Sequence, residues 1–316
     1  MNKKIAKQRK NKIIVTGGAG FIGSHLVDYL IEKGNEVIII DDLSSGNTKN
    51  INRLSTFFNI STINFGKLTQ IFQKIKPDYV YHLAANTNVP LSIKDPRYDF
   101  KTLEGSLNLL ELCRKYPPKL FFYVSSGFIF GNTKSRPINE TEQFRPISPY
   151  SITKRTIENY LEFYHSVYNL QYVGLRPATV YGPRQVKGAM ADYMDKLYND
   201  NQAEIYGDGS KTRDYLYVSD MISGINASTE LPPEKQNRIF NIGTSIETSL
   251  LELYNTIAAL MEKNSDPIFK DDRPGELKYY SIDHSLLTKE TGWKPQINLR
   301  EGLKKTLEFR GYIGKK

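Results

Sequence analysis

Short apolar runs alternate with longer helical patterns through the first half of the chain. Each run has the length of a buried strand and is too short for a helix. The runs that we predict as strands are 13–15, 37–40, 60–65, 79–83, 120–124 and 172–175. Between them, apolar residues recur every three or four positions, which predicts helices near 22–31, 68–75, 96–116 and 149–168. This alternation indicates an α/β fold, with a parallel sheet covered on both faces and ligands beyond the carboxyl ends of its strands.

The alternation loosens from about Pro177 onward. Strands are predicted at 203–206, 215–218 and 238–242, and helices near 250–261 and 299–309. We therefore expect a second, smaller α/β lobe. The expected division is a basic, flexible arm over 1–12, a first domain over 13–177 and the second lobe over 178–316, with the segment around 214–227 able to return to the first domain.

Three glycines between the first strand and the first helix are candidates for phosphate binding. Gly17, Gly20 and Gly23 are followed by a helical pattern, a second strand and Asp41. In such a unit the glycines permit a tight turn, a close approach of the backbone to a pyrophosphate, and close packing of helix on strand. The acid accepts hydrogen bonds from ribose hydroxyls and repels a 2′-phosphate. The order of these parts favours a Rossmann-type NAD-binding domain over an ordinary glycine-rich loop.

Charge and cysteine content narrow the functional classes. The formal charge is +9, but six cations lie within the first twelve residues, so the rest of the chain is nearly balanced. A basic block of this kind is typically solvated, and we expect neither nucleic-acid nor membrane binding. No apolar run approaches the length of about 18 residues that a membrane helix needs. The single cysteine, Cys113, predicts a buried thiol, no metal cluster and a cytoplasmic protein.

Tyr150 and Lys154 form a candidate proton-transfer pair. Four residues apart on a predicted helix, their side chains project from one face. A neighbouring ammonium, together with a positively charged nicotinamide, favours the phenolate and is expected to lower the tyrosine pKa. Tyr150 could then take a proton from a sugar hydroxyl, while Lys154 also holds the nicotinamide ribose. Ser126, at the end of the strand 120–124, could hydrogen-bond the reacting oxygen or merely cap the backbone.

These features resemble the extended short-chain dehydrogenase/reductase superfamily, and most closely its NAD-dependent nucleotide-sugar epimerases of the UDP-glucose 4-epimerase type. The resemblance spans nearly the whole chain. Its matching segments are 16–23, 82–85, 125–126, 150–154, 180–184, 207–209, 213–215, 241–243 and 273–275.

The resemblance implies a role for each matching residue. Ser126, Tyr150 and Lys154 correspond to the catalytic trio. Cofactor contacts are implied for Gly17, Gly20, Phe21, Ile22, Gly23, Asp41, Leu43, Ser44, Leu68, Leu83, Ala84, Ala85, Tyr150 and Lys154. Substrate contacts are implied for Ser126, Thr179, Tyr206, Arg213, Arg273 and Tyr280, of which the two arginines would grip a diphosphate.

The reaction implied is inversion of carbon 4 of a UDP-hexose. Oxidation would pass a hydride to NAD, and the 4-keto sugar would turn over and take it back on its other face. The 4,6-dehydratases of this superfamily carry an Asp-Glu pair after the catalytic hydroxyl, where this chain has Gly127 and Phe128. The bulk of Tyr280 points to UDP-glucose and UDP-galactose rather than N-acetyl sugars.

Alternatives remain open at this point. An epimerase or reductase acting on another nucleotide sugar, such as a UDP-N-acetylhexosamine or UDP-uronic acid, is the nearest, and a non-catalytic NAD sensor is the remotest. The residues Asp42, Lys67, Thr102 and Thr179 depart from the family pattern, and Lys67 stands where an aspartate usually binds adenine. Surplus apolar surface on the helices 96–116 and 149–168 predicts a homodimer, as the family implies.

Overall fold

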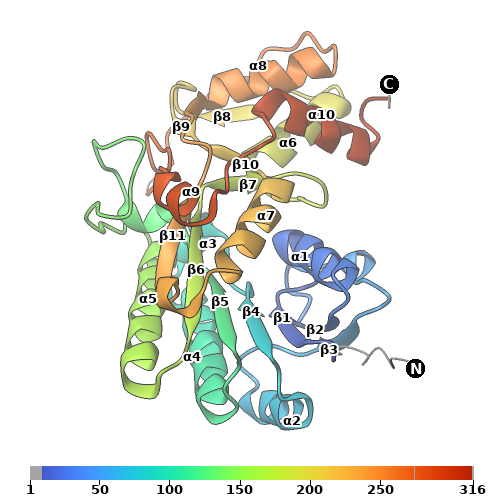
Figure 1. Ribbon diagram of the computed structural model, residues 1–316. Coiled ribbons are helices and arrows are strands. Elements are labelled where there is room, and N and C mark those ends of the chain that lie inside the picture. The colour runs from blue at the N-terminus through green and yellow to red at the C-terminus, as the bar shows by residue number, and fades with distance from the viewer. Residues whose placement is uncertain (1–8, 274, 315–316) are drawn as a thin grey trace.

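A seven-stranded parallel sheet forms the centre of the molecule, in a computed structural model that describes residues 9–273 and 275–314 (Figure 1). The strand order is β11-β6-β5-β4-β1-β2-β3. The strands are β1 (Lys12–Thr16), β2 (Glu36–Asp41), β3 (Thr56–Asn59), β4 (Tyr79–His82), β5 (Leu120–Val124), β6 (Tyr172–Pro177) and β11 (Arg238–Ile242). The predicted doubly wound fold is thereby confirmed. The order reverses at β1, where such folds bind their ligands.

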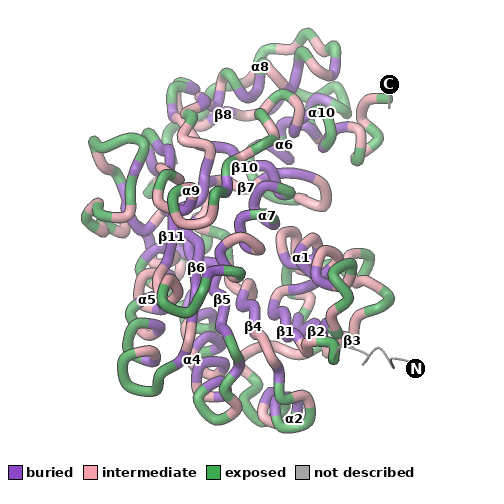
Figure 2. Tube along the Cα trace, viewed as in Figure 1, coloured by how far each residue is buried: buried purple, intermediate pink, exposed green. Residues whose placement is uncertain are grey.

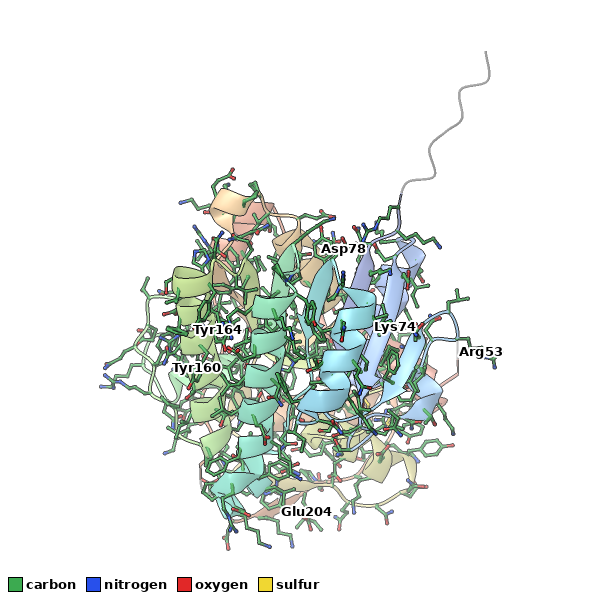
Figure 3. The ribbon with its side chains drawn as sticks, turned by 90° about the horizontal axis from the view of Figure 1, so that it is seen from below. Arg53, Lys74, Asp78, Tyr160, Tyr164 and Glu204 are labelled. Carbon is green, nitrogen blue, oxygen red and sulfur yellow. The ribbon has the colours of Figure 1, made fainter. Side chains whose placement is uncertain are left out.

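Helices cover both faces of this sheet because its strands are apolar on both sides. In β1, Ile13 and Val15 belong to one core and Ile14 to the other. The first core is closed by α1 (Phe21–Glu32) and α7 (Val218–Thr229). The second is closed by α2 (Phe65–Ile75), α4 (Phe100–Lys115) and α5 (Pro149–Tyr168). Figure 3 shows these last three helices side by side across one face, and Figure 2 shows the buried strands between the layers.

Two boundaries differ from the sequence prediction. The strand expected at 60–65 lies earlier, at β3, and Phe65 already starts α2. The side chain of Asn64 caps that helix by accepting a hydrogen bond from the Lys67 amide, so the apolar Ile63 and Phe65 flank a helix start. The helix expected from Pro96 begins as a short 3₁₀ turn, η2 (Pro96–Asp99), and becomes α-helical at Phe100.

Two segments beyond residue 178, α7 and β11, pack against the first domain. The strand β11, which the sequence pattern placed in the second lobe, pairs in parallel with β6 at the edge of the main sheet. The helix α7, within the segment expected to return, packs through Met221, Ile222 and Ile225 into the core shared with α1. The second lobe is therefore not one continuous segment, because strand pairing and core burial join pieces that are distant in sequence.

The second lobe has its own core and short strand pairs. The helices α6 (Ala189–Tyr198), α8 (Leu250–Leu260) and α10 (Leu299–Arg310) enclose a cluster that includes Met194, Leu253 and Leu303. Its strands pair as β7 (Thr179–Tyr181) with β10 (Tyr215–Tyr217), β8 (Glu204–Tyr206) with β13 (Ile268–Lys270), and β9 (Thr212–Arg213) with β12 (Thr248–Ser249). The helix expected at 299–309 is confirmed as α10.

Short elements complete the described chain. They are η1 (Thr48–Asn50), α3 (Val89–Lys94), η3 (Gly127–Phe130), η4 (Pro233–Lys235) and α9 (Ser285–Thr291). No helix within residues 9–273 and 275–314 is long and apolar enough to cross a bilayer. Most of the predicted basic arm lies outside the described residues, and Lys12 is already the first residue of β1.

Candidate active site

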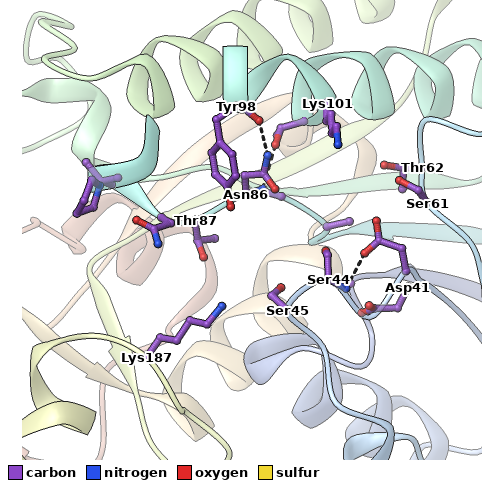
Figure 4. Close-up of a pocket in the computed structure, with 18 of the residues that line it drawn as sticks. Asp41, Ser44, Ser45, Ser61, Thr62, Asn86, Thr87, Tyr98, Lys101 and Lys187 are labelled. Carbon is purple, nitrogen blue, oxygen red and sulfur yellow. Dashed lines mark hydrogen bonds between the residues drawn. The ribbon is translucent and has the colours of Figure 1, made fainter. Parts of the chain in front are cut away.

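A cleft of about 950 Å³ lies at the carboxyl ends of β1, β2 and β4. Its walls come from both lobes: Gly17, Asp41 and Ala84 from the first, and Lys187 and Arg273 from the second. Figure 4 shows that Lys187 extends into this space from the loop before α6, opposite the serines that follow β2. The volume suits a ligand of the size of a dinucleotide rather than a single sugar.

The glycine loop is tightly closed on itself. Gly17 has φ +72°, a left-handed conformation that favours glycine, and a Cβ there would lie 2.8 Å from the amide nitrogen of Ala84. A Cβ on Gly23 would overlap the carbonyl oxygen of Gly17. The helix α1 starts after Gly20 without any side-chain cap. Its first amides are therefore left for an anion at this end of the cleft.

Asp41 clamps the same loop from the end of β2. Its carboxylate accepts hydrogen bonds from the Ala19 amide at 3.0 Å and the Leu43 amide at 2.8 Å. Burial raises the pKa of Asp41, and these two backbone donors oppose the rise. Because each carboxylate oxygen has a second lone pair, Asp41 can hold the loop and still accept a ribose hydroxyl.

The three predicted catalytic residues meet between the end of β5 and the first two turns of α5. Tyr150 lies in the first turn of α5, where its amide donates to the Ser92 hydroxyl at 2.7 Å. The Lys154 ammonium lies one turn later, donates to the Val124 carbonyl at 2.7 Å, and is 6.0 Å from the centre of the Tyr150 ring. Ser126 follows β5, lies close enough to the Tyr150 side chain to lower its pKa, and accepts a hydrogen bond from the Phe128 amide at 3.2 Å. It thus caps the backbone, which is one of the two roles considered for it.

Burial has the largest effect on the pKa values of both Tyr150 and Lys154. It raises the pKa of Tyr150 to about 12, opposed by the nearby Ser126 hydroxyl. It lowers the pKa of Lys154 to about 8, opposed by the charges of Glu158 and Asp99. The expected lowering of the tyrosine pKa by Lys154 is not found, because desolvation dominates and the ammonium is bound to the Val124 carbonyl. The pair needs a further positive charge before the phenol loses its proton readily.

A buried ion pair supports the helix behind these residues. Glu158, one turn after Lys154, accepts two hydrogen bonds of 2.9 Å from Arg176 on β6 and one from the Ser125 hydroxyl. Arg155 adds a third cationic contact at 3.0 Å. Because Glu158 is fully buried and its charge is matched by Arg176, this network fixes α5 against the end of the sheet. Ser125 therefore has a structural role.

Of the predicted substrate residues in the second lobe, Arg273 lines the cleft, whereas Thr179, Tyr206, Arg213 and Tyr280 do not. The guanidinium of Arg273 lies 3.4 Å from the centre of the Tyr206 ring and borders the cleft. Arg213 donates to the carbonyls of Thr212 and Leu277, which holds its side chain in place. Thr179 has a buried hydroxyl with no hydrogen-bond partner among the described residues. Tyr280 is fully buried, and its hydroxyl donates to the Pro177 carbonyl at 3.3 Å.

Some residues lie elsewhere than the family pattern implied. The side chain of Leu68 is fully buried in the core between α2 and the sheet, so it does not reach the cleft. Lys67 is exposed on α2 and does not border the cleft either. Ser61 and Thr62, in the turn that follows β3, border it instead. The observed end of β3 lies six residues earlier than predicted, and placing the adenine-side residues by that end would have found them.

The remaining predicted cofactor residues lie in the segments that follow β1, β2 and β4, and some of them line the cleft. Phe21 and Ile22 form the first turn of α1, and Ser44, Ala84 and Ala85 border the cleft directly. Leu43 and Leu83 lie beside it, each next to a residue that borders it. Thr102 holds the loop after β4, because its hydroxyl accepts the Asn86 amide at 3.0 Å. The residues present therefore fit a dinucleotide: a glycine cradle, uncapped helical amides and a ribose-binding acid.

Fold and site together define a dinucleotide-dependent protein with a tyrosine and a lysine one helical turn apart on α5. The family model for the NAD dependent epimerase/dehydratase family matches residues 13–243. A putative UDP-glucose 4-epimerase of Methanocaldococcus jannaschii is 37% identical over 304 residues, which cover 94% of this chain and 97% of that protein.

Two solved structures are similar over nearly the whole chain. UDP-glucose 4-epimerase of Thermotoga maritima with UDP-glucose has a TM-score of 0.92 and 40% identity, covering 95% of this chain and 98% of that one. UDP-glucose 4-epimerase of Thermus thermophilus in complex with NAD has a TM-score of 0.89 and 33% identity, covering 96% and 100%. The chain belongs to the NAD dependent epimerase/dehydratase family.

Proposed function

We propose that this protein is an NAD-dependent epimerase that inverts carbon 4 of a UDP-hexose and interconverts UDP-glucose and UDP-galactose. The observation that carries this proposal is the meeting of Ser126, Tyr150 and Lys154 after the carboxyl end of β5, on the same edge of the sheet as the dinucleotide cleft. Similarity to UDP-glucose 4-epimerases across more than nine-tenths of the chain supports the substrate class.

The proton chemistry falls to Tyr150. The glycine loop and Asp41 would hold NAD, which would supply the means of removing a hydride from carbon 4 and restoring it on the opposite face of the sugar. As the hydride leaves, the Tyr150 phenolate takes the proton of the 4-hydroxyl, with Ser126 hydrogen-bonded to the same oxygen. Lys154 keeps a positive charge behind the phenolate, and its ammonium is held in place by its hydrogen bond to the Val124 carbonyl. Return of the proton from Tyr150 completes the inverted alcohol.

Arg273 and Arg213 are suited to the diphosphate of the substrate. A guanidinium forks onto phosphate oxygens, and the two side chains are held in place by the Tyr206 ring and by two carbonyls, respectively. The sugar would then lie near Thr179, whose unpartnered hydroxyl offers it a hydrogen bond. Because the arginines would hold the substrate by its diphosphate, the ketosugar could rotate in the pocket between the two hydride transfers.

Dehydration is disfavoured at this site. Gly127 and Phe128 follow Ser126 directly, and neither side chain can transfer a proton. Tyr280 contacts both, since a Cβ on Gly127 would overlap its hydroxyl and its ring meets Phe128 edge-on at 5.1 Å. This filled corner supports an unsubstituted hexose over an N-acetyl sugar.

The test is turnover of a panel of UDP-sugars by purified protein, with products resolved by chromatography. We expect UDP-glucose and UDP-galactose to interconvert without added reductant. Tyr150→Phe should abolish turnover and retain NAD, as measured by the cofactor released on denaturation. Tyr116→Phe removes a hydroxyl at the carboxyl end of α4, away from Tyr150, and is the matched control. Turnover only of N-acetyl or uronic acid sugars would transfer the proposal to those substrates, and an active Tyr150→Phe variant would refute the mechanism.

We also propose a cytoplasmic homodimer formed through α4 and α5. Ile152, Phe163 and Val167 are each about half exposed, and their spacing places them on the side of α5 away from the sheet. Phe100 at the start of α4 is 64% exposed. Large exposed apolar side chains on two neighbouring helices favour a protein partner. The single buried thiol of Cys113 supports a reducing compartment. Light scattering of the wild type and of Val167→Glu tests the dimer, which the charge should dissociate.

A further inference from the structure

Asp99 is a buried acid without a hydrogen-bond partner. It is the last residue of η2 and is 1% exposed. Neither of its carboxylate oxygens accepts a hydrogen bond from any residue that the structure describes. Removing an unpaired carboxylate from water costs several kcal/mol, so such a group needs a compensating charge or a function.

The surroundings of Asp99 supply one cation. On α3, the hydroxyl of Ser92 lies close enough to lower the pKa of Asp99 without forming a hydrogen bond of proper geometry. On α5, Lys154 is the positive group that acts on it. Burial has the largest effect and raises the pKa of Asp99. Ser92 also accepts a hydrogen bond from the Tyr150 amide at 2.7 Å, and η2, which ends at Asp99, packs against both α3 and α5. These three elements therefore form one packed unit.

The other titratable groups around Lys154 and Tyr150 are accounted for. Lys154 faces Glu158 on its own helix, His82 on β4 and the ring of Tyr123 on β5, 4.9 Å away. Glu158 is already neutralised by Arg176 and Arg155. Tyr150 faces Ser126, Tyr123 and Tyr280. Of the two acids near Lys154, Glu158 is paired with arginines, whereas Asp99 has Lys154 as its neighbouring cation.

We propose that Asp99 is a positioning residue for the reaction, whose buried negative charge holds Lys154 as an ammonium ion behind Tyr150 and sets the pH range in which the pair works. This inference rests on the proposed function. A negative charge raises the proton affinity of every group near it, so Asp99 acts on both members of the pair in the same direction.

Because Asp99 shifts the pKa values of Tyr150 and Lys154 in the same direction, its loss should have a recognisable effect on the pH profile. In the described structure Asp99 raises the pKa of Tyr150 as well as that of Lys154. Removing the charge should therefore lower both values. With the positive nicotinamide bound, which should bring the Tyr150 pKa below that of Lys154, the acid limb of the activity profile should report the tyrosine and the alkaline limb the lysine. Both limbs should then move to lower pH. A structural defect alone would lower the rate without moving the two limbs together.

The experiment compares the pH dependence of kcat/KM for UDP-galactose in the wild type and in Asp99→Asn. We expect both limbs to move to lower pH by about one unit. Glu104→Gln, which removes an exposed acid from the adjoining helix α4, is the matched control and should not move the profile. An Asp99→Asn profile that coincides with the wild type would overturn the inference.

Folding and function are separated by two further measurements. Circular dichroism checks that each variant is folded, and Asp99→Ser replaces Asp99→Asn if the amide does not fit. If neither neutral variant folds while Asp99→Glu does, the carboxylate is structural and the inference is overturned. A wild type inactive on every UDP-sugar refutes the proposed function. An active wild type whose Asp99 variants keep its pH profile refutes only this inference.

Discussion

The hydroxyl of Tyr280 occupies the space that a Cβ on Gly127 would take, immediately after the serine that lies beside Tyr150. Residue 127 therefore has to be glycine as long as residue 280 is tyrosine. The two residues lie far apart in the chain, yet together they close one corner beside Ser126.

Opening this corner should widen the range of sugars. In Tyr280→Cys most of the ring is removed, which leaves a cavity large enough for an N-acetyl group. We expect the ratio of kcat/KM for UDP-N-acetylglucosamine to that for UDP-glucose to rise about tenfold or more. Stability should fall by about 3 kcal/mol, because the ring is fully buried.

Tyr279→Cys is the control for this prediction. Tyr279 adjoins Tyr280 but is 42% exposed, so its loss should change neither the sugar ratio nor the stability appreciably. An unchanged ratio in a folded Tyr280→Cys variant would mean that another residue limits the sugar pocket.

Removing Arg273 should weaken substrate binding more than the chemical step. Its guanidinium is held at the cleft by the Tyr206 ring, in a position to pair with a diphosphate. We expect Arg273→Ala to raise KM for UDP-glucose by about 10- to 100-fold, the effect of losing charge-assisted hydrogen bonds. Steady-state kinetics measure this, with Arg300→Ala on α10 as an exposed control. A loss confined to kcat would contradict the assigned role.

The activity should have an alkaline limit set by Lys154. Burial lowers its pKa to about 8, and the charged form is the one that stabilises the phenolate. Activity should therefore decline as pH rises through about 8, as the ammonium loses its proton. Lys154→Met should lose about 100-fold or more of kcat, in line with other proton-transfer groups. A rate that stays constant to pH 10 would show that the charge on Lys154 is dispensable.

Stability should fall in mild acid because of His82. This buried histidine lies between the hydroxyls of Thr16 at 2.7 Å and Ser106 at 2.8 Å, and burial lowers its pKa to about 3. The unfolded chain binds the proton near pH 6.5, so stability present above that pH is lost as pH falls toward 3. Between pH 7 and 5 the loss from this group is about 2 kcal/mol.

Urea unfolding at several pH values measures this effect. His82→Gln keeps a polar side chain between the two hydroxyls but cannot take up the proton. Its stability should depend less steeply on pH between 7 and 5 than that of the wild type. Equal slopes for the two proteins would assign the acid sensitivity to other groups.

Local patterns in the sequence were sufficient for the central features of the fold and site. The apolar run of β1, the glycines, α1 and Asp41 are neighbours in the chain, and their spacing reflects short-range geometry. Tyr150 and Lys154 share a helical face for the same reason. Nearly every predicted strand of the first domain is confirmed, except that β3 ends at Asn59, where a polar cap at Asn64 outweighed the apolar residues after it.

Only the tertiary structure decided which distant segments come together. Periodicity reports that a segment is buried but not against what, so β11 was assigned to the wrong lobe and Leu68 was expected at the cleft rather than in the core. The contact of Tyr280 with Gly127 and the burial of Asp99 beside Lys154 depend on long-range packing in the same way. The sequence determined the dinucleotide unit and the proton-transfer pair because both are local, whereas the sugar pocket and the charges around the pair are properties of the assembled fold.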